Sequence, residues 1–298
     1  MKKVLVIAGP TASGKSALAV HLAKKFGGEV ISGDSIQVYR GMDIGSGKVT
    51  EEEMQGIPHH LIDILDPKES YSAADFQRMA RELIERIDVP IITGGTGLYL
   101  KACLYDYDFS EEEDIPLDER YLAMDNHALH EALKEIDPKS AEKIHENNRR
   151  RVLRAIAIAK RTGMTKSEQE EKQSHQPMYD IFIAGCTMER SLLYDRINRR
   201  VTGMFEEGLE AEVRGLLERG VSFDDVSMRG IGYQEFRPYF EGTASLEEVK
   251  LEIQKHSRNY AKRQYTWFNH QMPVHWYDVS REGWILQAES ETELWRCL

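Results

Sequence analysis

The feature that most constrains this chain is the motif Gly-Pro-Thr-Ala-Ser-Gly-Lys-Ser at residues 9–16. It follows the apolar run 4–7, which predicts a buried strand, and it precedes residues 16–26, whose apolar pattern predicts a helix. Glycines in such a loop let backbone N–H groups converge on phosphate oxygens, and the helix N-terminus adds positive potential. The motif therefore predicts a site for a diphosphate or a triphosphate. The alternative is a glycine-rich turn that binds no ligand.

The residues of this loop are candidate phosphate ligands. Lys15 supplies a positive charge, Thr11 can donate a hydrogen bond, and Ser16 carries a hydroxyl that can bind Mg²⁺. The predicted set for a diphosphate or nucleotide is Gly9, Pro10, Thr11, Ala12, Ser13, Gly14, Lys15 and Ser16. We expect Mg²⁺ as the cofactor and Ser16 as its protein ligand.

Nucleotide-hydrolysing enzymes with such a loop usually have a second apolar strand ending in an aspartate that binds the metal through water. This sequence has no such strand. Residues 89–93 predict a strand, but it runs into Gly-Gly-Thr-Gly-Leu-Tyr at 94–99. The backbone of this turn and the Thr96 hydroxyl can approach a ligand at the carboxyl edge of a sheet. A purely structural turn explains the same residues equally well.

A carboxylate, Asp34, follows the strand predicted at residues 29–32. It therefore lies at the carboxyl edge of the predicted sheet, where a carboxylate can orient a nucleophile or accept its proton. The alternative is an aspartate that only caps a turn or a helix.

Strands and helices alternate along much of the chain, which predicts an α/β fold with a P-loop NTPase-like parallel sheet flanked by helices. A helix is predicted after the N-cap Ser72 and a fourth strand at 181–184. Residues 190–218 and 246–270 predict helices in the C-terminal part.

The pattern changes at residues 105–146, which contain acidic residues, short helical stretches and an Asp137-Pro138 break. We expect a catalytic core with C-terminal helices at 1–104 and 147–298, and a small helical insertion at 105–146. Residues 166–176 have few apolar side chains and predict a solvated loop.

The formal net charge of −11 argues against indiscriminate binding of nucleic acid, but basic residues cluster at 149–161, 190–200 and 255–263. These clusters leave room for one cationic face, although each also fits an ordinary solvated surface. Aromatic residues near the third cluster can stack on bases or pack in a core.

No stretch reaches the roughly 18 apolar residues that span a bilayer. The three cysteines form no pair typical of a metal or disulfide framework. We expect a cytoplasmic protein without membrane contact.

Six motifs, in order, carry a resemblance to a known family. Four of them are the phosphate loop, Asp-Ser-Ile-Gln-Val-Tyr at 34–39, Gly-Met-Asp-Ile-Gly at 41–45, and the 94–99 turn. Together they strongly resemble the bacterial tRNA dimethylallyltransferases, also called tRNA isopentenyltransferases or IPP transferases. Arg-Gly-Ile-Gly-Tyr at 229–233 and Ala-Lys-Arg-Gln-Tyr-Thr-Trp at 261–267 look like that family's tRNA-contacting segments. The resemblance covers nearly the whole chain.

The resemblance implies transfer of a dimethylallyl group from dimethylallyl diphosphate to N6 of adenosine 37, beside the tRNA anticodon, with release of diphosphate. The phosphate loop of this family binds the isoprenoid diphosphate, which accounts for the missing strand-terminal aspartate. By position in the motifs, the implied catalytic residues are Asp34, which takes or orients the N6 proton, Thr96 at the bridging oxygen, and Arg200 at the diphosphate.

The resemblance also implies two partners, the anticodon stem-loop of tRNA and dimethylallyl diphosphate, and we expect a monomer. The implied tRNA-binding residues are Asp34, Ser35, Ile36, Gln37, Thr96, Arg120, Arg150, Arg151, Arg154, Arg229, Gly232, Tyr233, Lys262, Arg263, Gln264 and Trp267.

Three other functions remain open from the residues alone. One is a P-loop kinase for a small metabolite, with Asp34 as base and the arginines of 149–154 as a lid. Another is a nucleic-acid-binding module whose phosphate loop is regulatory or vestigial. The third is prenylation of free adenine nucleotides.

Overall fold

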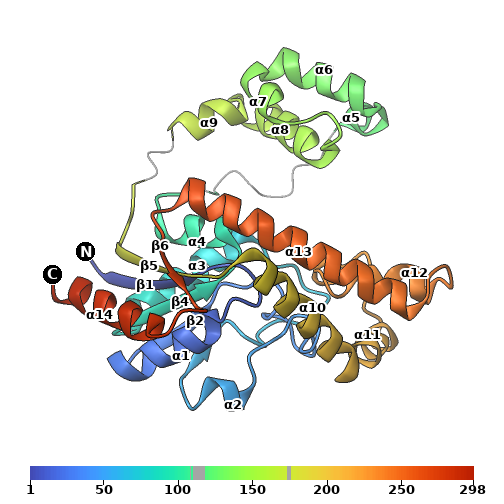
Figure 1. The fold of residues 1–298 in the computed structure, drawn as a ribbon. Coiled ribbons are helices and arrows are strands. Elements are labelled where there is room, and N and C mark those ends of the chain that lie inside the picture. Colours follow the sequence, from blue (N-terminus) through green and yellow to red (C-terminus); the bar gives the residue numbers. More distant parts are fainter. Residues whose placement is uncertain (108, 110–117, 173–175) are drawn as a thin grey trace. The chain divides into compact units, whose positions relative to one another are not determined.

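The computed structural model describes residues 1–107, 109, 118–172 and 176–298. Within these residues, six parallel strands form one sheet in the order β3-β2-β4-β1-β5-β6 (Figure 1). The strands are β1 (Lys3–Ala8), β2 (Glu29–Ser32), β3 (His59–His60), β4 (Pro90–Gly94), β5 (Asp180–Thr187) and β6 (His275–Asp278). The predicted α/β fold with a parallel sheet is confirmed.

The central strand is β1, which pairs with β4 on one side and with β5 on the other. Its residues Val4 to Ala8 are all buried, as expected for a parallel strand covered on both faces. The four predicted strands are present. The sequence did not predict β3 and β6, because β3 has only two residues and the edge strand β6 has a single buried one, Tyr277.

Helices cover both faces of this sheet (Figure 1). On one face, α1 (Lys15–Phe26) and α14 (Trp284–Cys297) place Leu18, Leu22 and Ala288 in one core cluster with Leu5 and Ile7. The opposite face carries α3 (Ala73–Arg86) and α4 (Gly97–Leu104), which meet through the stacked rings of Phe76 and Tyr99. A capping box between Ser72 and Asp75 begins α3, so the predicted N-cap is confirmed.

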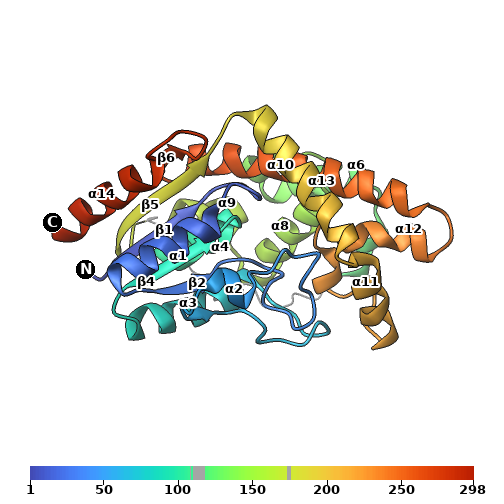
Figure 2. The same ribbon diagram turned by 60° about the horizontal axis from the view of Figure 1, so that its bottom comes forward.

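Two long helices lie next to each other beside the sheet (Figure 2). They are α10 (Arg190–Glu206) and α13 (Leu246–Gln271), and they share a core of Leu193, Ile197 and Ala261. The remaining elements of this part are α2 (Glu51–Met54), α11 (Leu209–Glu218), α12 (Arg237–Phe240) and two 3₁₀ turns at Ser227–Arg229 and Gln234–Phe236. None of the helices in the described part of the chain is long and apolar enough to cross a membrane.

The chain divides into two compact units, residues 1–104 with 177–298 and residues 105–176. The second unit begins where the insertion was predicted, but it ends at 176 and not at 146. The reason is the apolar face of α8 (Arg149–Thr162), where Val152 and Ile156 share a core with Leu129 and Leu133 of α6 (Asn126–Ile136). The basic residues of α8 masked this face in the sequence pattern. Residues 108 and 110–117 of the predicted insertion lie outside the described residues.

The loop predicted at 166–176 is also wrong, because residues 166–172 form α9 (Lys166–Lys172). Ser167 of this helix is buried, and its hydroxyl and backbone N–H donate to the two oxygens of Asp137 at 2.6 and 3.0 Å. Asp137 also accepts a hydrogen bond from Ser140 N and so caps α7 (Pro138–Lys143). The Asp137-Pro138 break is therefore a helix start. Residues 173–175 lie outside the described part. The helix α5 (Glu119–Ala123) also belongs to this unit.

We expect Asp137→Ala to lower the free energy of unfolding of the second unit by about 2–3 kcal/mol, since it leaves buried donors of Ser140 and Ser167 without an acceptor. Denaturant unfolding followed by circular dichroism measures the change. The control is Asp125→Ala, which removes an exposed cap that accepts from Ala128 N and should cost about 1 kcal/mol. Equal losses in the two variants would show that Asp137 does not join α7 to α9.

Candidate active site

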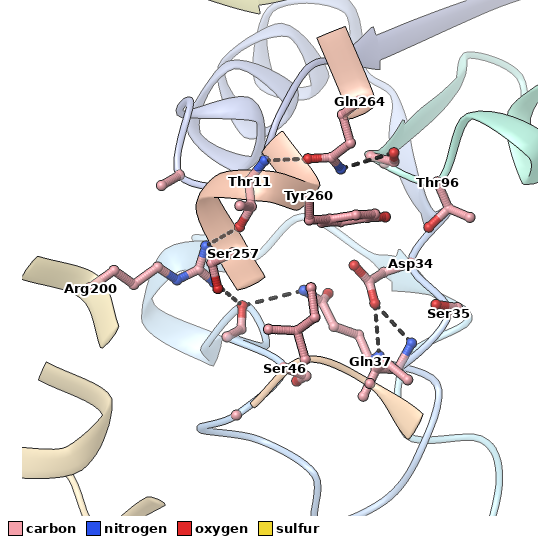
Figure 3. A pocket seen from close by; sticks show the side chains of 18 of the residues that line it. Thr11, Asp34, Ser35, Gln37, Ser46, Thr96, Arg200, Ser257, Tyr260 and Gln264 are labelled. Carbon is pink, nitrogen blue, oxygen red and sulfur yellow. Dashed lines mark hydrogen bonds between the residues drawn. The ribbon is translucent and has the colours of Figure 1, made fainter. Parts of the chain in front are cut away.

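A cavity of about 420 Å³ lies at the carboxyl ends of β1, β2 and β4, and all its lining residues belong to the first unit. Figure 3 shows side chains from the phosphate loop, from the segment after β2, and from α10 and α13 pointing into it. The predicted site residues that line it are Thr11, Ala12, Lys15, Ser16, Asp34, Ser35, Ile36, Gln37, Thr96, Arg200, Arg229, Arg263 and Gln264. Residues far apart in the sequence thus meet in one place.

The phosphate loop joins β1 to α1 as its sequence predicts. Gly14 has φ 92° at the helix N-cap, a conformation that favours glycine. A Cβ on Gly9 would lie 2.6 Å from the carbonyl oxygen of Cys186, so β5 requires glycine at this position. Ala12 also adopts a left-handed conformation, with φ 62°. Gly9, Pro10, Ser13 and Gly14 shape the loop from behind and do not line the cavity.

Lys15 begins α1 and lines the cavity. Its ammonium group donates to the carbonyl oxygen of Pro10 at 2.7 Å. Burial lowers the pKa of Lys15 to about 8, and no carboxylate is bonded to it among the described residues. A negatively charged ligand at this place would favour the protonated amine.

A second cation, Arg200, projects from α10 toward the same loop (Figure 3). Its Nη1 donates to Thr11 Oγ1 at 3.3 Å and its Nη2 to the carbonyl oxygen of Gly47 at 3.0 Å. Burial lowers the pKa of Arg200, but a guanidinium remains charged in proteins. Neutral oxygens thus orient this charge.

Asp34 has one of the two roles considered for it, that of capping a turn, and it also lines the cavity. Its Oδ1 accepts from the backbone N–H groups of Ile36 at 2.8 Å and Gln37 at 3.3 Å, so it does cap a turn. Its other carboxylate oxygen points into the cavity toward Tyr260 (Figure 3). Thr96 lies at the same edge, where its carbonyl accepts the first hydrogen bonds of α4.

Gln264 is buried and bonds to two loops at once. Its Oε1 accepts from Thr11 N at 3.0 Å, and its Nε2 donates to the carbonyl oxygen of Gly95 at 2.9 Å. It was predicted to contact tRNA. In the structure both ends of the amide bind the protein, and they fix the phosphate loop relative to the turn after β4.

Gly232 and Tyr233, which were also predicted to bind tRNA, are both buried. The Tyr233 hydroxyl donates to Glu212 at 2.8 Å and accepts from Ser46 N at 3.1 Å. Gly232 has φ 102°, and a Cβ there would lie 2.9 Å from the carbonyl oxygen of Gly45. Both residues therefore shape the wall behind the cavity.

The outer side of α13 carries a separate shallow groove of about 510 Å³. The predicted residues Lys262 and Trp267 line it, and Arg263 lines both the groove and the cavity. The Trp267 ring packs over Gly97, whose Cβ, if present, would lie 2.1 Å from it.

The other predicted tRNA residues belong to the second unit. Arg150, Arg151 and Arg154 are exposed on α8. Arg120 pairs with Asp118 at 2.9 Å and lies over the ring of Tyr121.

The IPP transferase family model matches residues 37–271. This chain belongs to the IPP transferase family. The predicted resemblance is thereby confirmed.

Individual relatives of this IPP transferase agree. The tRNA dimethylallyltransferase of Bacillus cytotoxicus is 51% identical over 288 residues, which cover 94% of this chain and 91% of that one. The crystal structure of the full-length tRNA isopentenylpyrophosphate transferase of Bacillus halodurans is 45% identical, with a TM-score of 0.76, and covers 99% of this chain and 97% of that one. A crystallographic structure of a eukaryotic dimethylallyltransferase acting on tRNA is 29% identical, with a TM-score of 0.83, and covers 99% and 78% of the two chains.

Some lining residues of this IPP transferase were not predicted as site residues. They are Ser46 and Gly47 after the 41–45 motif, Ile197, Val201 and Met204 of α10, Ile231, and Ile253, Ser257 and Tyr260 of α13. The helical spacing of these residues could have identified them. Residues 197, 200, 201 and 204 lie on one face of α10, and residues 253, 257, 260 and 264 lie on one face of α13.

We expect the affinity of this IPP transferase for inorganic pyrophosphate to fall as the pH rises above about 8. Above that pH the free amine of Lys15 must first take up a proton, which costs up to about tenfold in affinity per pH unit. Calorimetry between pH 7 and 10, at saturating Mg²⁺, measures the profile.

The control is Lys15→Met, since the ratio of the two affinities cancels the titration of pyrophosphate itself. That ratio should be constant below pH 8 and decline above it. Parallel profiles for the two proteins would exclude Lys15 as the titrating group.

Proposed function

We propose that this chain transfers a dimethylallyl group from dimethylallyl diphosphate to N6 of adenosine 37 in tRNA and releases diphosphate. The observation that carries the proposal is a single cavity that contains the cations Lys15 and Arg200 together with the carboxylate Asp34. The names of the relatives, tRNA dimethylallyltransferase and tRNA isopentenylpyrophosphate transferase, support this activity over the small-metabolite kinase.

The diphosphate would bind at the phosphate loop. Backbone N–H groups at the start of α1, the Lys15 ammonium and the Arg200 guanidinium all supply positive potential there. These groups would stabilise the leaving group most strongly once it has become a free diphosphate, because its negative charge is then largest.

Mg²⁺ fits this site as an ion that arrives with the diphosphate. Ser16 is exposed and lines the cavity, and no group of three or more metal-binding side chains occurs among the residues the structure describes. Magnesium keeps several water and phosphate ligands when it binds substrate phosphates, so the Ser16 hydroxyl suffices as the protein ligand. When bound, the ion would neutralise part of the diphosphate charge.

The cavity also has an apolar wall against which the hydrocarbon part of the donor would pack. Ile197, Val201 and Met204 of α10 line the cavity beside Arg200, and Ile231 and Ile253 add to the apolar surface. A five-carbon isoprenoid can bury its surface against these side chains. This wall favours an isoprenoid diphosphate as the ligand of the loop.

Asp34 would act on the adenine amine. The exocyclic N6 is a weak nucleophile, so the reaction needs both a good leaving group and a base. As the N6–carbon bond forms, the carbon–oxygen bond to diphosphate breaks and its electron pair leaves with the diphosphate, while the N6 proton passes to Asp34. The Thr96 hydroxyl, at the same edge of the sheet, would contact the bridging oxygen.

The RNA partner we propose is the anticodon stem-loop. An adenine in a loop can be splayed out into a cavity, whereas one in a stem cannot. The groove with Lys262 and Trp267 adjoins the cavity through Arg263, and the arginines of α8 offer exposed charge. We also propose that the protein acts as a monomer.

The direct test incubates the protein with labelled dimethylallyl diphosphate, Mg²⁺ and unmodified tRNA that has adenosine 3′ of its anticodon. Parallel reactions replace the tRNA by AMP, or the donor by labelled ATP. Label in tRNA alone supports the proposal. Label in AMP would assign a nucleotide prenyltransferase, and phosphate transferred from ATP would assign a kinase.

We expect Asp34→Asn to lower the single-turnover rate by about 10²–10⁴-fold and to leave tRNA affinity nearly unchanged. The asparagine oxygen can still accept from Ile36 and Gln37, so the turn is preserved and only the base is lost. Rapid quench measures the rate and filter binding the affinity. A large loss of affinity at an unchanged rate would contradict the role of Asp34.

We expect Gly47→Ala to lower pyrophosphate affinity and turnover by about tenfold or more, because its Cβ would lie 1.6 Å from Arg200 Nη2 and displace the guanidinium. Calorimetry and the transfer assay measure the two effects. The matched control is Gly203→Ala, in the same helix as Arg200, where the nearest atom is 3.9 Å away. The control should keep full activity, and equal effects of the two changes would exclude the displacement of Arg200.

A further inference from the structure

Glu212 lies on α11, and no residue of that helix lines the cavity. Its carboxylate nevertheless makes four hydrogen bonds to segments that do reach the cavity. Oε2 accepts from the backbone N–H groups of Asp43 at 2.9 Å and Ile44 at 2.7 Å. Oε1 accepts from Gly45 N at 3.0 Å and from the Tyr233 hydroxyl at 2.8 Å.

Three consecutive backbone N–H groups that point at one carboxylate form an anion-binding nest inside the protein. Such bonds are charge-assisted and stronger than bonds between neutral groups. An amide at this position would turn an NH₂ group toward one or more of these donors. The negative charge of Glu212 therefore holds the backbone N–H groups of residues 43–45 in place.

The fixed segment continues directly into the wall of the cavity, where Gly45, Ser46 and Gly47 are lining residues. Ser46 N donates to the Tyr233 hydroxyl, which gives the segment a second connection to Glu212. The next carbonyl, that of Gly47, accepts from Arg200 Nη2 at 3.0 Å and from Gln37 Nε2 at 3.3 Å.

Arg200 depends closely on this carbonyl. Its guanidinium occupies the space where a Cβ of Gly47 would lie, so the side chain rests on the backbone of residue 47. Its only other bond in the described residues is the longer one to Thr11 Oγ1, at 3.3 Å. A shift of the 43–47 segment would therefore move the guanidinium.

We propose that Glu212 is a positioning residue for the transfer reaction: it fixes residues 43–45 so that the Gly47 carbonyl holds Arg200 toward the diphosphate. This rests on the proposed function. The ligand that Glu212 serves is an organic diphosphate, and Glu212 itself touches neither substrate.

A double-mutant cycle tests this role. Glu212→Gln should lower the single-turnover rate of transfer to tRNA by about tenfold to a hundredfold, since small displacements of a positioned group cost that much. In an Arg200→Ala background the same change should lower the rate less than about twofold. Glu210→Gln, on the same helix and ion-paired only with Arg214 in the described residues, is the control and should change neither rate.

An equal loss in both backgrounds would overturn the proposal, because Glu212 would then act independently of Arg200. If Glu212→Gln fails to fold, Tyr233→Phe takes its place. It removes one of the four donors, should lower the rate a few-fold, and should have no effect in the Arg200→Ala background. Additive effects of Tyr233→Phe and Arg200→Ala would likewise overturn the proposal.

Binding of inorganic pyrophosphate with Mg²⁺ separates this inference from the proposed function. Glu212→Gln and Arg200→Ala should each weaken pyrophosphate binding, and the double variant should bind no more weakly than Arg200→Ala alone. A wild-type protein that binds pyrophosphate in this pattern but transfers no label to tRNA would refute only the proposed function. Unchanged affinity in Glu212→Gln would refute the positioning role.

Discussion

The site depends on two partly buried positive charges that have no bonded carboxylate among the described residues. Lys15 donates to the carbonyl of Pro10, and Arg200 donates to the carbonyl of Gly47 and to Thr11. Carbonyl oxygens orient a cation but compensate little of the free energy lost when it leaves water. The lowered pKa of Lys15 records that loss. A site of this kind is complementary to an anion before the anion arrives.

Much of the surrounding structure keeps these two charges in place. Gln264 joins the phosphate loop to the turn after β4, and Glu212 joins the 43–45 segment to α11. The glycines make the close approaches possible, because a Cβ at Gly45 would lie 2.5 Å from the Tyr233 ring and one at Gly95 2.1 Å from Gln264. The motif glycines thus mark where side chains from distant elements press on the backbone.

The sequence predicted the elements whose signal is local. The apolar run of β1, the capping residue Ser72 and the loop between β1 and α1 were all identified, because each depends on neighbouring residues. The roles of Gln264 and Tyr233 were not identified. Gln264 bonds to Thr11, 253 residues away, and Tyr233 bonds to Glu212, 21 residues away, and nothing in a single sequence reports such pairing. The boundary at 146 failed for a similar reason, because charge on one face of α8 hid an apolar face that pairs with α6.

The helix α13 contributes residues to both the cavity and the groove. Tyr260 and Gln264 of this helix line the cavity, Lys262 and Trp267 line the groove, and Arg263 lines both. A helix is stiff and rises about 1.5 Å per residue, so the helix itself sets the distance between the residues that line the cavity and those that line the groove. Gln264 binds the phosphate loop, so it also fixes the position of α13 relative to that loop. If RNA binds along the groove as proposed, this helix would hold it at a set distance from the cavity.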